Sequence, residues 1–256
     1  MRAAAATRLR TDPATRAAEK LGAARRVTVI TGAGVSAASG IPTFRGAGGL
    51  WKNHRPESLA TAAAFARDPV TVWEWYAWRR QRIAEATPNA AHAVLARWSQ
   101  RFEAFTLVTQ NVDGLHEQAG TKNVVRFHGS IWRLRCTRRC GAPEWEDRNA
   151  AQRTLPRCET CGAVARPGVV WFGEEIPSEA VQAAFDALDC DVCLVAGTSS
   201  VVTPAAGLVG EARRRGAYAI EINPEATPVT GGVDLAIAGR AEEVLVEIEK
   251  RLSVKG

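Results

Sequence analysis

The chain has 256 residues, of which 46% are hydrophobic and 23% are charged. These proportions are typical of a folded globular protein and exclude a disordered or collagen-like chain. No run approaches the ~18 apolar residues of a membrane-spanning helix, so we expect no membrane partner. The net charge is +6, from 33 Lys and Arg against 27 Asp and Glu. Because Arg is spread along the chain and no run is purely basic, we interpret this excess as composition bias rather than a nucleic-acid surface.

Strand and helix patterns alternate along most of the chain. Short β-branched runs that end at Gly or polar residues predict buried strands over 27–31, 105–109, 124–127, 191–196, 217–222 and 233–237. The predicted helices are 13–25, 58–86 with a break at Asp68-Pro69, 89–101, 204–215 and 241–252. Strands separated by helices indicate an α/β fold with a doubly wound, Rossmann-like parallel sheet.

The cysteines fall into three close pairs. The pairs are Cys136/Cys140, Cys158/Cys161 and Cys190/Cys193. Residues 1–20 hold no apolar segment of the kind that directs export, so we expect a cytoplasmic protein with reduced thiols. The first two pairs offer four thiolates, which suit tetrahedral Zn²⁺ and close its coordination shell, and so predict one structural zinc ion. Cys193 lies inside an apolar strand and is interpreted as a core residue.

The cysteine-rich segment interrupts the alternation of strands and helices. Helical periodicity disappears over residues 128–168, while Arg, Gly and Pro become common. We therefore expect a smaller zinc-binding and helical module inserted into the Rossmann-like fold. The predicted division is a Rossmann-like domain of 20–45, 88–127 and 168–256, a helical part 46–87, a zinc-binding part 128–167 and an N-terminal extension 1–19.

A glycine motif follows the first predicted strand. Residues 32–37 read GAGVSA and fit the pattern G-x-G-x-x-[G/A], in which glycines permit a tight turn and close approach to a pyrophosphate. A dehydrogenase usually carries an acidic residue about 20 positions later, at the end of its second strand. Here that region is a Gly-rich loop with only Glu57 nearby. The motif therefore indicates a dinucleotide site, but not a dehydrogenase.

Polar side chains also follow other predicted strands. Residues 109–116 read TQNVDGLH directly after a buried strand, where polar groups are costly unless they have partners. The alternative is a turn in which Asn and Asp cap the next helix. His128 follows another strand, at the junction with the cysteine-rich segment, where a general base would be useful. Because parallel strands end at one edge of a sheet, we expect these loops to form one site together with 197–203 and 223–225.

These motifs together resemble the sirtuin family. They are GAGVSAASGIPTFRG at 32–46, QNVDGLH at 110–116, His128-Gly129, the four cysteines, Phe172-Gly173-Glu174, Gly197-Thr198-Ser199 and Asn223. The resemblance implies a monomeric, NAD-dependent protein-lysine deacylase that consumes NAD and acts on acylated-lysine proteins or peptides. Nicotinamide would leave, the acyl oxygen would attack the ribose, and His128 would activate a ribose hydroxyl as general base. The products would be free lysine, nicotinamide and O-acyl-ADP-ribose.

The resemblance also implies which residues form the site. Catalysis would use His128 and Asn111. NAD would be bound by Gly32, Ala33, Gly34, Ser36, Gly40, Thr43, Phe44, Arg45, Trp51, Gln110, Asn111, Val112, Asp113, Gly197, Thr198, Ser199, Asn223, Pro224, Glu225 and Ala241. The acylated peptide would be bound by Ala60, Tyr76, Arg79, Val170, Trp171, Phe172 and Gly173, and zinc by Cys136, Cys140, Cys158 and Cys161.

Tyr76 and Arg79 suggest the kind of acyl group. Positions i and i+3 share one face of a helix, so a hydroxyl and a guanidinium there can grip a carboxylate together. This spacing resembles the class III sirtuins, which remove succinyl and malonyl groups, and the small Ala60 and the Thr43 before Phe44 are similar to that class. The alternative is that Tyr76 packs among tryptophans and Arg79 is solvated.

Three other functions are weighed against this one. The charge and the cysteine pairs also suit a zinc-containing nucleic-acid-binding module, although the dinucleotide motif does not. An NAD-dependent protein ADP-ribosyltransferase would use the same scaffold. A dehydrogenase is disfavoured by the missing acidic residue.

Overall fold

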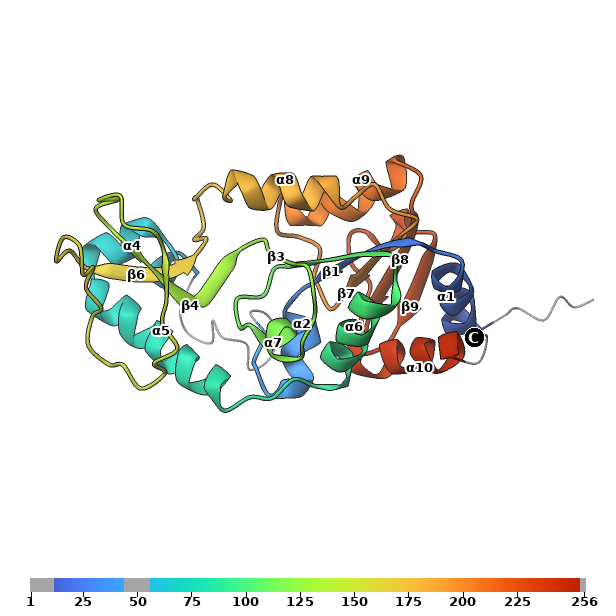
Figure 1. The fold of residues 1–256 in the computed structure, drawn as a ribbon, viewed down its shortest axis with the longest axis horizontal. Helices are drawn as coiled ribbons and strands as arrows, with labels where there is room; N and C mark the ends of the chain where they lie inside the picture. Colours follow the sequence, from blue (N-terminus) through green and yellow to red (C-terminus); the bar gives the residue numbers. More distant parts are fainter. Residues whose placement is uncertain (1–11, 44–55, 254–256) are drawn as a thin grey trace, which may run out of the picture.

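The computed structural model describes residues 12–43 and 56–253 and has two lobes (Figure 1). The larger lobe holds a six-stranded sheet in the order β3-β2-β1-β7-β8-β9, and all its neighbouring strands are parallel. The strands are β1 (Arg26–Thr31), β2 (Ala104–Thr109), β3 (Val124–Arg126), β7 (Val192–Ala196), β8 (Tyr218–Asn223) and β9 (Leu235–Ala238). The strand order reverses between β1 and β7, so the predicted doubly wound, Rossmann-like sheet is confirmed.

Helices cover both faces of this sheet. Figure 1 shows α8 (Ser178–Asp186) and α9 (Leu208–Arg214) above it, and α6 (Ala90–Arg101) and α10 (Ala241–Ser253) below it. The first helix, α1 (Pro13–Gly22), buries Ala14, Ala17 and Leu21 in the same core as α10. Residues 13–19 therefore pack into the larger lobe, although they fall within the predicted N-terminal extension. Helix α8 was not predicted, although Val181, Ala184 and Phe185 have the i, i+3, i+4 spacing of an apolar stripe and pack against the core.

The smaller lobe combines helices with a three-stranded antiparallel sheet. Its sheet has the order β5-β4-β6, formed by β4 (Gly129–Cys136), β5 (Trp145–Glu146) and β6 (Ala165–Val169). Its helices are α3 (Pro56–Leu59), α4 (Ala62–Arg67) and α5 (Pro69–Ala84). Asp68 caps α5 by accepting from Thr71 N, and Pro69 fits the first helical turn, so the predicted break lies there. The sheet was not predicted, although Trp132, Leu134 and Cys136 of β4 alternate with two arginines as in a half-buried strand.

A buried arginine joins α5 to the cysteine-rich segment. The Arg80 side chain is fully buried, with its guanidinium 5.6 Å from the ring centroid of Trp73 and 5.2 Å from that of Trp132. It also pairs with the carboxylate of Asp147 at 3.2 Å and donates to the Asp147 carbonyl. Because a buried charge is costly without such partners, these contacts hold the helix and the sheet in one arrangement.

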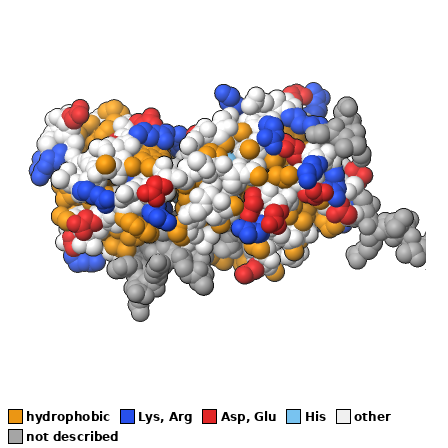
Figure 2. Space-filling model, turned by 90° about the horizontal axis from the view of Figure 1, so that it is seen from below, with side chains coloured by type: hydrophobic (Ala, Val, Ile, Leu, Met, Phe, Trp, Pro, Cys, Tyr) orange, Lys and Arg blue, Asp and Glu red, His pale blue; other side chains and the backbone are white. Residues whose placement is uncertain are grey.

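Charged side chains of both signs are interspersed on the face shown in Figure 2. Several arginines of the cysteine-rich segment are also paired within the protein. Arg133 Nε lies 3.7 Å from Glu144 Oε2, and Arg148 Nε lies 2.6 Å from Glu146 Oε1. Arg135 Nη2 lies 3.0 Å from Glu174 Oε2. These pairs reduce the positive charge that this segment presents to a polyanion. Across the described residues, every helix is too short or too polar to cross a membrane.

The four predicted zinc ligands converge in the smaller lobe. The sulfur atoms of Cys136, Cys140, Cys158 and Cys161 all lie within 4.8 Å of one another. The Cys136 and Cys161 sulfurs are 3.5 Å apart, and the Cys140 and Cys158 sulfurs are 3.7 Å apart. A tetrahedral site with Zn–S bonds of about 2.3 Å has S–S edges of about 3.8 Å, so the residues are positioned for a structural zinc ion. Cys193 is fully buried in the larger lobe, as predicted for a core residue.

The N-terminus of α6 depends on a buried, neutral histidine. The Asn89 backbone N–H donates to Nδ1 of His92 at 3.2 Å, and Asn89 Nδ2 donates to the carbonyl of Val35 at 2.8 Å. Burial lowers the pKa of His92 to about 4. The His116 ring lies 4.8 Å from the His92 ring, and burial also holds its pKa well below 6.5. Both rings are therefore neutral in the folded protein at neutral pH.

Removing the zinc should unfold the cysteine-rich segment. Cys140→Ser removes one ligand, so we expect the purified protein to hold far less than one zinc per chain and to lose activity indirectly. Zinc content is measured with a colorimetric chelator, and folding by tryptophan fluorescence. Cys190→Ser is the matched control, since Cys190 lies in the core of the larger lobe and should leave the zinc content at one per chain. Full zinc retention in Cys140→Ser would contradict the assignment.

Acid should destabilise the fold through His92. The unfolded chain takes up a proton near pH 6.5 while the folded chain does not until about pH 4, so stability falls as the pH drops through this window. From pH 7.5 to pH 5, this difference corresponds to about 2 kcal/mol of unfolding free energy. Urea denaturation at the two pH values measures it, and His92→Gln should show a smaller pH dependence. An equal dependence in His92→Gln would rule out His92 as its source.

Candidate active site

A cavity of about 1280 Å³ lies where the strands of the larger lobe end and the smaller lobe begins. Loops that follow β1, β2, β7, β8 and β9 all contribute to its wall, as expected for the carboxyl edge of a doubly wound sheet. Most of the predicted residues line it. They are Gly32, Ala33, Gly34, Thr43, Ala60, Tyr76, Arg79, Gln110, Asn111, Val112, His128, Val170, Trp171, Phe172, Gly173, Gly197, Thr198, Ser199, Asn223, Pro224, Glu225 and Ala241.

The glycine motif packs against a second loop at the point where the strand order reverses. Gly34 N donates to the carbonyl of Gly197 at 2.7 Å. A Cβ atom on Gly32 would lie 2.7 Å from Cβ of Thr198, and one on Gly197 would lie 2.5 Å from the backbone nitrogen of Val35. Gly197 also has φ of 60°. These glycines are therefore required by contact between the two loops, in addition to the close approach of a ligand.

Two predicted residues lie behind the cavity wall. Ser36 and Asp113 are almost fully buried, and Ser36 Oγ donates to the Asp113 carboxylate at 2.8 Å. Asn111, which does line the cavity, donates through Nδ2 to the Gly32 carbonyl at 3.0 Å and to Ser36 Oγ at 3.1 Å. Burial raises the pKa of Asp113 above its usual 3.8, while its bonds from Leu115 N and Ser36 oppose the rise. This arrangement fixes the side chain of Asn111 from behind.

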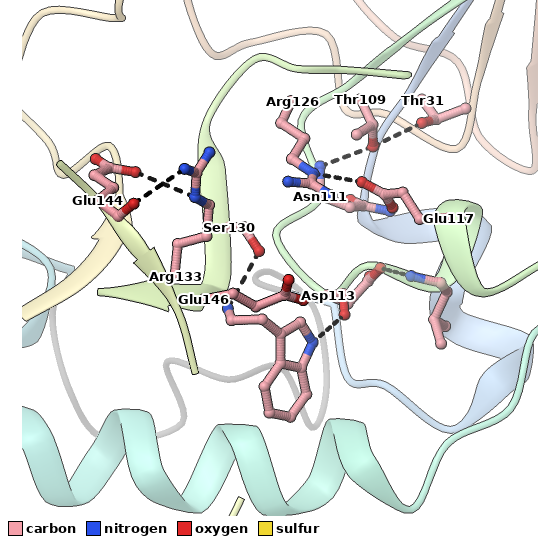
Figure 3. A network of polar contacts seen from close by, with 12 residues as sticks. Thr31, Thr109, Asn111, Asp113, Glu117, Arg126, Ser130, Arg133, Glu144 and Glu146 are labelled. Atoms are coloured by element: carbon pink, nitrogen blue, oxygen red, sulfur yellow. Dashed lines mark hydrogen bonds and ion pairs between the residues drawn. The ribbon is translucent and has the colours of Figure 1, made fainter. Parts of the chain in front are cut away.

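Further bonds hold this group to both lobes. Figure 3 shows Thr31, Thr109 and Asn111 side by side, and Thr31 Oγ donates to Thr109 Oγ at 2.9 Å. The backbone N–H of Asn111 donates to the same Thr109 oxygen at 3.0 Å. On the other side, the indole of Trp132 donates to the Asp113 carbonyl at 2.6 Å. The loop at 109–116 is thereby held between β1 and the smaller lobe, and not only by capping bonds of a turn.

His128 has the geometry and protonation of a base. Its Nδ1 lies 3.3 Å from the carbonyl of Gln110, and because a carbonyl only accepts, Nδ1 carries the proton. The other ring nitrogen of the neutral imidazole is then an acceptor. Burial lowers the pKa of His128 below 6.5, and the bond to Gln110 opposes the shift. The Gln110 side chain donates to Thr198 Oγ at 3.0 Å. This bond connects the histidine to the loop that holds Gly197.

Tyr76 and Arg79 reach the same cavity from α5. Both side chains are buried, with 2% and 6% of their surface exposed, so Arg79 is not solvated as the alternative required. The Arg79 guanidinium lies 4.8 Å from the ring centroid of Trp75 and 5.5 Å from that of Tyr76. Burial lowers the pKa of Arg79, and nearby Tyr76 and Asp113 oppose the shift. Ala60 lines this end too and keeps it open because its side chain is small.

The segment predicted to bind the peptide closes the rim of this end. Val170 N donates to the His128 carbonyl at 3.0 Å, and Phe172 N donates to the Ala60 carbonyl at 3.0 Å. The Phe172 side chain is 50% exposed, whereas Trp171 is buried. Only part of this segment therefore faces outward, and Trp171 contributes its side chain to the interior.

The opposite end of the cavity holds residues that the sequence analysis missed. Arg240 and Glu242 line it and form an ion pair with Nε–Oε1 of 2.6 Å. They follow β9 at the carboxyl edge of the sheet, so the rule that selected Asn223 and Glu225 could have found them. Asn223 Nδ2 donates to the Glu225 carbonyl at 3.0 Å and shapes the neighbouring loop.

Gly40 is the remaining predicted residue that the structure describes away from the cavity wall. Gly40 ends a short helical turn with φ of 81° and does not line the wall that the structure describes. Phe44, Arg45 and Trp51 lie outside the described residues.

Comparison with known proteins connects these features to one family. A family model described as the Sir2 family matches residues 32–204. An NAD-dependent protein deacylase of Aquifex aeolicus is 47% identical over 230 residues, which is 90% of this chain and 96% of that protein.

Solved structures agree with the sequence comparisons. A Sir2 homologue in complex with NAD has 45% identity and a TM-score of 0.89, with 94% of both chains covered. A mutated Sir2 with a deacetylated p53 peptide and 3′-O-acetyl ADP-ribose has 28% identity and a TM-score of 0.82, with 93% of this chain and 98% of that chain covered. The predicted resemblance is thus confirmed, and the chain belongs to the Sir2 family.

Proposed function

We propose that this protein is an NAD-dependent protein-lysine deacylase that removes succinyl and malonyl groups, and also acetyl groups, from lysine. The products are deacylated lysine, nicotinamide and O-acyl-ADP-ribose. The observation that carries the proposal is a single cavity lined by the neutral His128, by the two glycine-containing loops that touch each other, and by buried Arg79 with Tyr76. The names of the relatives support NAD and acylated lysine as the reactants.

Different parts of the cavity bind the two substrates and take up the proton. NAD supplies, as co-substrate, the ribose that accepts the acyl group when nicotinamide leaves. The glycine loop and the Gly197 loop let its phosphates approach the backbone closely, because their glycines carry no side chain, and Asn223 and Glu225 receive the adenine ribose. Asn111 and Gln110 hold the nicotinamide end, with Ser36 and Asp113 fixing Asn111. His128 takes the proton of a ribose hydroxyl at Nε2, since its Nδ1 already donates to Gln110.

The acyl preference follows from the charge buried at the α5 end. The Arg79 guanidinium is a positive charge that is buried beside the cavity, so an anionic acyl group that reaches it gains a charge-assisted interaction away from bulk water. Tyr76 adds a hydroxyl beside it, and the spacing of the pair resembles that of class III sirtuins. Acetyl groups are too short and uncharged to use it. The proposal therefore ranks succinyl and malonyl above acetyl.

The alternatives have less support. An ADP-ribosyltransferase would have no use for a buried acyl-carboxylate site beside the base. The internal pairing of Arg133, Arg135 and Arg148 disfavours a nucleic-acid module. The proposal includes a monomeric enzyme in the cytoplasm, and the use of two cysteine pairs as zinc ligands suits a reducing compartment.

Replacing the base should stop acyl transfer. We expect His128→Ala to lower kcat by about 10²–10⁴-fold, because it removes general base catalysis. The exchange of labelled nicotinamide into NAD should persist, since the base acts after nicotinamide leaves. In the unmodified enzyme, kcat/KM should stay level down to about pH 6.5 and fall only below it, because the pKa of His128 is lowered from 6.5. Undiminished deacylation in His128→Ala would contradict this role.

Two matched peptides test the function and the acyl preference together. Mass spectrometry with NAD should show faster loss of succinyl than of acetyl, with O-succinyl-ADP-ribose formed. Arg79→Met should lower kcat/KM for succinyl-lysine by about tenfold or more, while acetyl-lysine is affected little. Arg82→Met is the matched control on the same helix, because Arg82 is exposed and pairs with Glu85. Equal losses on both peptides would show that Arg79 does not bind the acyl carboxylate.

A further inference from the structure

A tryptophan outside the reacting groups determines how Tyr76 can bond. The indole nitrogen of Trp171 lies 2.8 Å from the Tyr76 hydroxyl oxygen, and both side chains are buried. An indole N–H only donates, so the tyrosine oxygen accepts in this bond. The phenol's single proton must then point somewhere other than Trp171.

Arg79 and Glu174, the charged neighbours of Tyr76, do not accept this proton, so it points toward the cavity. The guanidinium of Arg79 lies 5.5 Å from the Tyr76 ring centroid and, like the indole, can only donate. The carboxylate of Glu174 influences Tyr76 electrostatically, but it accepts from Arg166 Nη2 at 2.7 Å and 2.8 Å and from Arg135 Nη2 at 3.0 Å. An oxygen of an anionic ligand beside Arg79 is therefore a suitable acceptor for the Tyr76 proton.

The indole is held firmly enough to impose this direction. The Arg166 guanidinium stacks on it at 3.7 Å from the ring centroid, and the centroid of the Phe65 ring lies 5.3 Å away. Glu174 fixes both parts of this stack, since it also accepts from the backbone N–H of Trp171 at 2.9 Å. With its ring stacked and its backbone bonded, Trp171 keeps its N–H aimed at the tyrosine.

We propose that Trp171 is a positioning residue for acyl selectivity, which makes the Tyr76 hydroxyl a donor toward the carboxylate of the acyl group. Arg79 supplies charge, whereas the Trp171–Tyr76 pair supplies a directed hydrogen bond at a fixed place. This inference rests on the acyl preference in the proposed function. It adds a residue that acts through Tyr76 and does not itself touch the acyl group.

Peptide binding tests the inference without depending on NAD chemistry. Fluorescence anisotropy compares a labelled succinyl-lysine peptide with the same peptide carrying a succinamoyl group, in which an amide replaces the carboxylate. Trp171→Phe keeps an aromatic ring and removes the N–H, so we expect the ratio of the two affinities to fall by about tenfold. In a Tyr76→Phe background, the same substitution should change the ratio little, because the hydroxyl is already absent.

Two further variants separate the N–H from the packing of the ring. Replacing Trp171 by benzothienylalanine exchanges the N–H for sulfur at nearly constant shape, and it should reproduce the loss seen with Trp171→Phe. Trp98→Phe is the matched control in the larger lobe, since Trp98 is buried and its nitrogen has no hydrogen-bond partner among the described residues. Its peptide selectivity should equal that of the unmodified protein.

The outcomes distinguish this inference from the proposed function. Carboxylate selectivity that depends on Trp171 in a protein without deacylation would support the inference and overturn only the proposed activity. Unchanged selectivity in Trp171→Phe and in the sulfur variant would overturn the inference while leaving the deacylase intact. An equal loss with and without the Tyr76 hydroxyl, or no selectivity in the unmodified protein, would also overturn it.

Discussion

The active-site cavity depends on two loop backbones that touch without any side chain between them. Gly34 and Gly197 meet through a 2.7 Å hydrogen bond at the ends of β1 and β7, the two strands between which the sheet order reverses. A methyl group on Gly32, Gly34 or Gly197 would collide with backbone atoms of the other loop. At this contact the cavity is lined by the backbone of the two loops. It also sets where Thr198 lies, and through Gln110 where His128 lies.

Next to this contact, buried polar groups form a network behind the cavity wall. Ser36, Asn111 and Asp113 bond to one another, and Trp132 reaches the Asp113 carbonyl from the smaller lobe. Such a network rigidifies a site only when its members are satisfied, because an unpaired buried group costs more than one hydrogen bond contributes. The smaller lobe therefore does more than support a zinc ion: it completes the bonding of the loop that carries Asn111.

The sequence allowed some parts of this site to be predicted and not others. Buried parallel strands read as short β-branched runs, so their order along the chain and the polar loops after them were recognisable. The G-x-G motif located the first loop, but it did not distinguish Ala33, which lines the cavity, from Ser36, which lies behind it. That distinction depends on the turn of a short helix. The Trp171–Tyr76 contact joins residues 95 positions apart and left no periodic signal.

The role of Arg79 could not be recognised until its surroundings in the fold were known. From the sequence it was one arginine on a helix with several, and only packing against Trp75 and Tyr76 distinguishes it from exposed Arg82. A guanidinium held in that place loses hydration in every folded molecule, whether or not a substrate is present. An anionic acyl group that reached Arg79 would therefore meet a positive charge whose position is set before binding. The influence of Arg79 extends to Asp113, so the charge proposed to select the acyl group is also felt by the group that fixes Asn111.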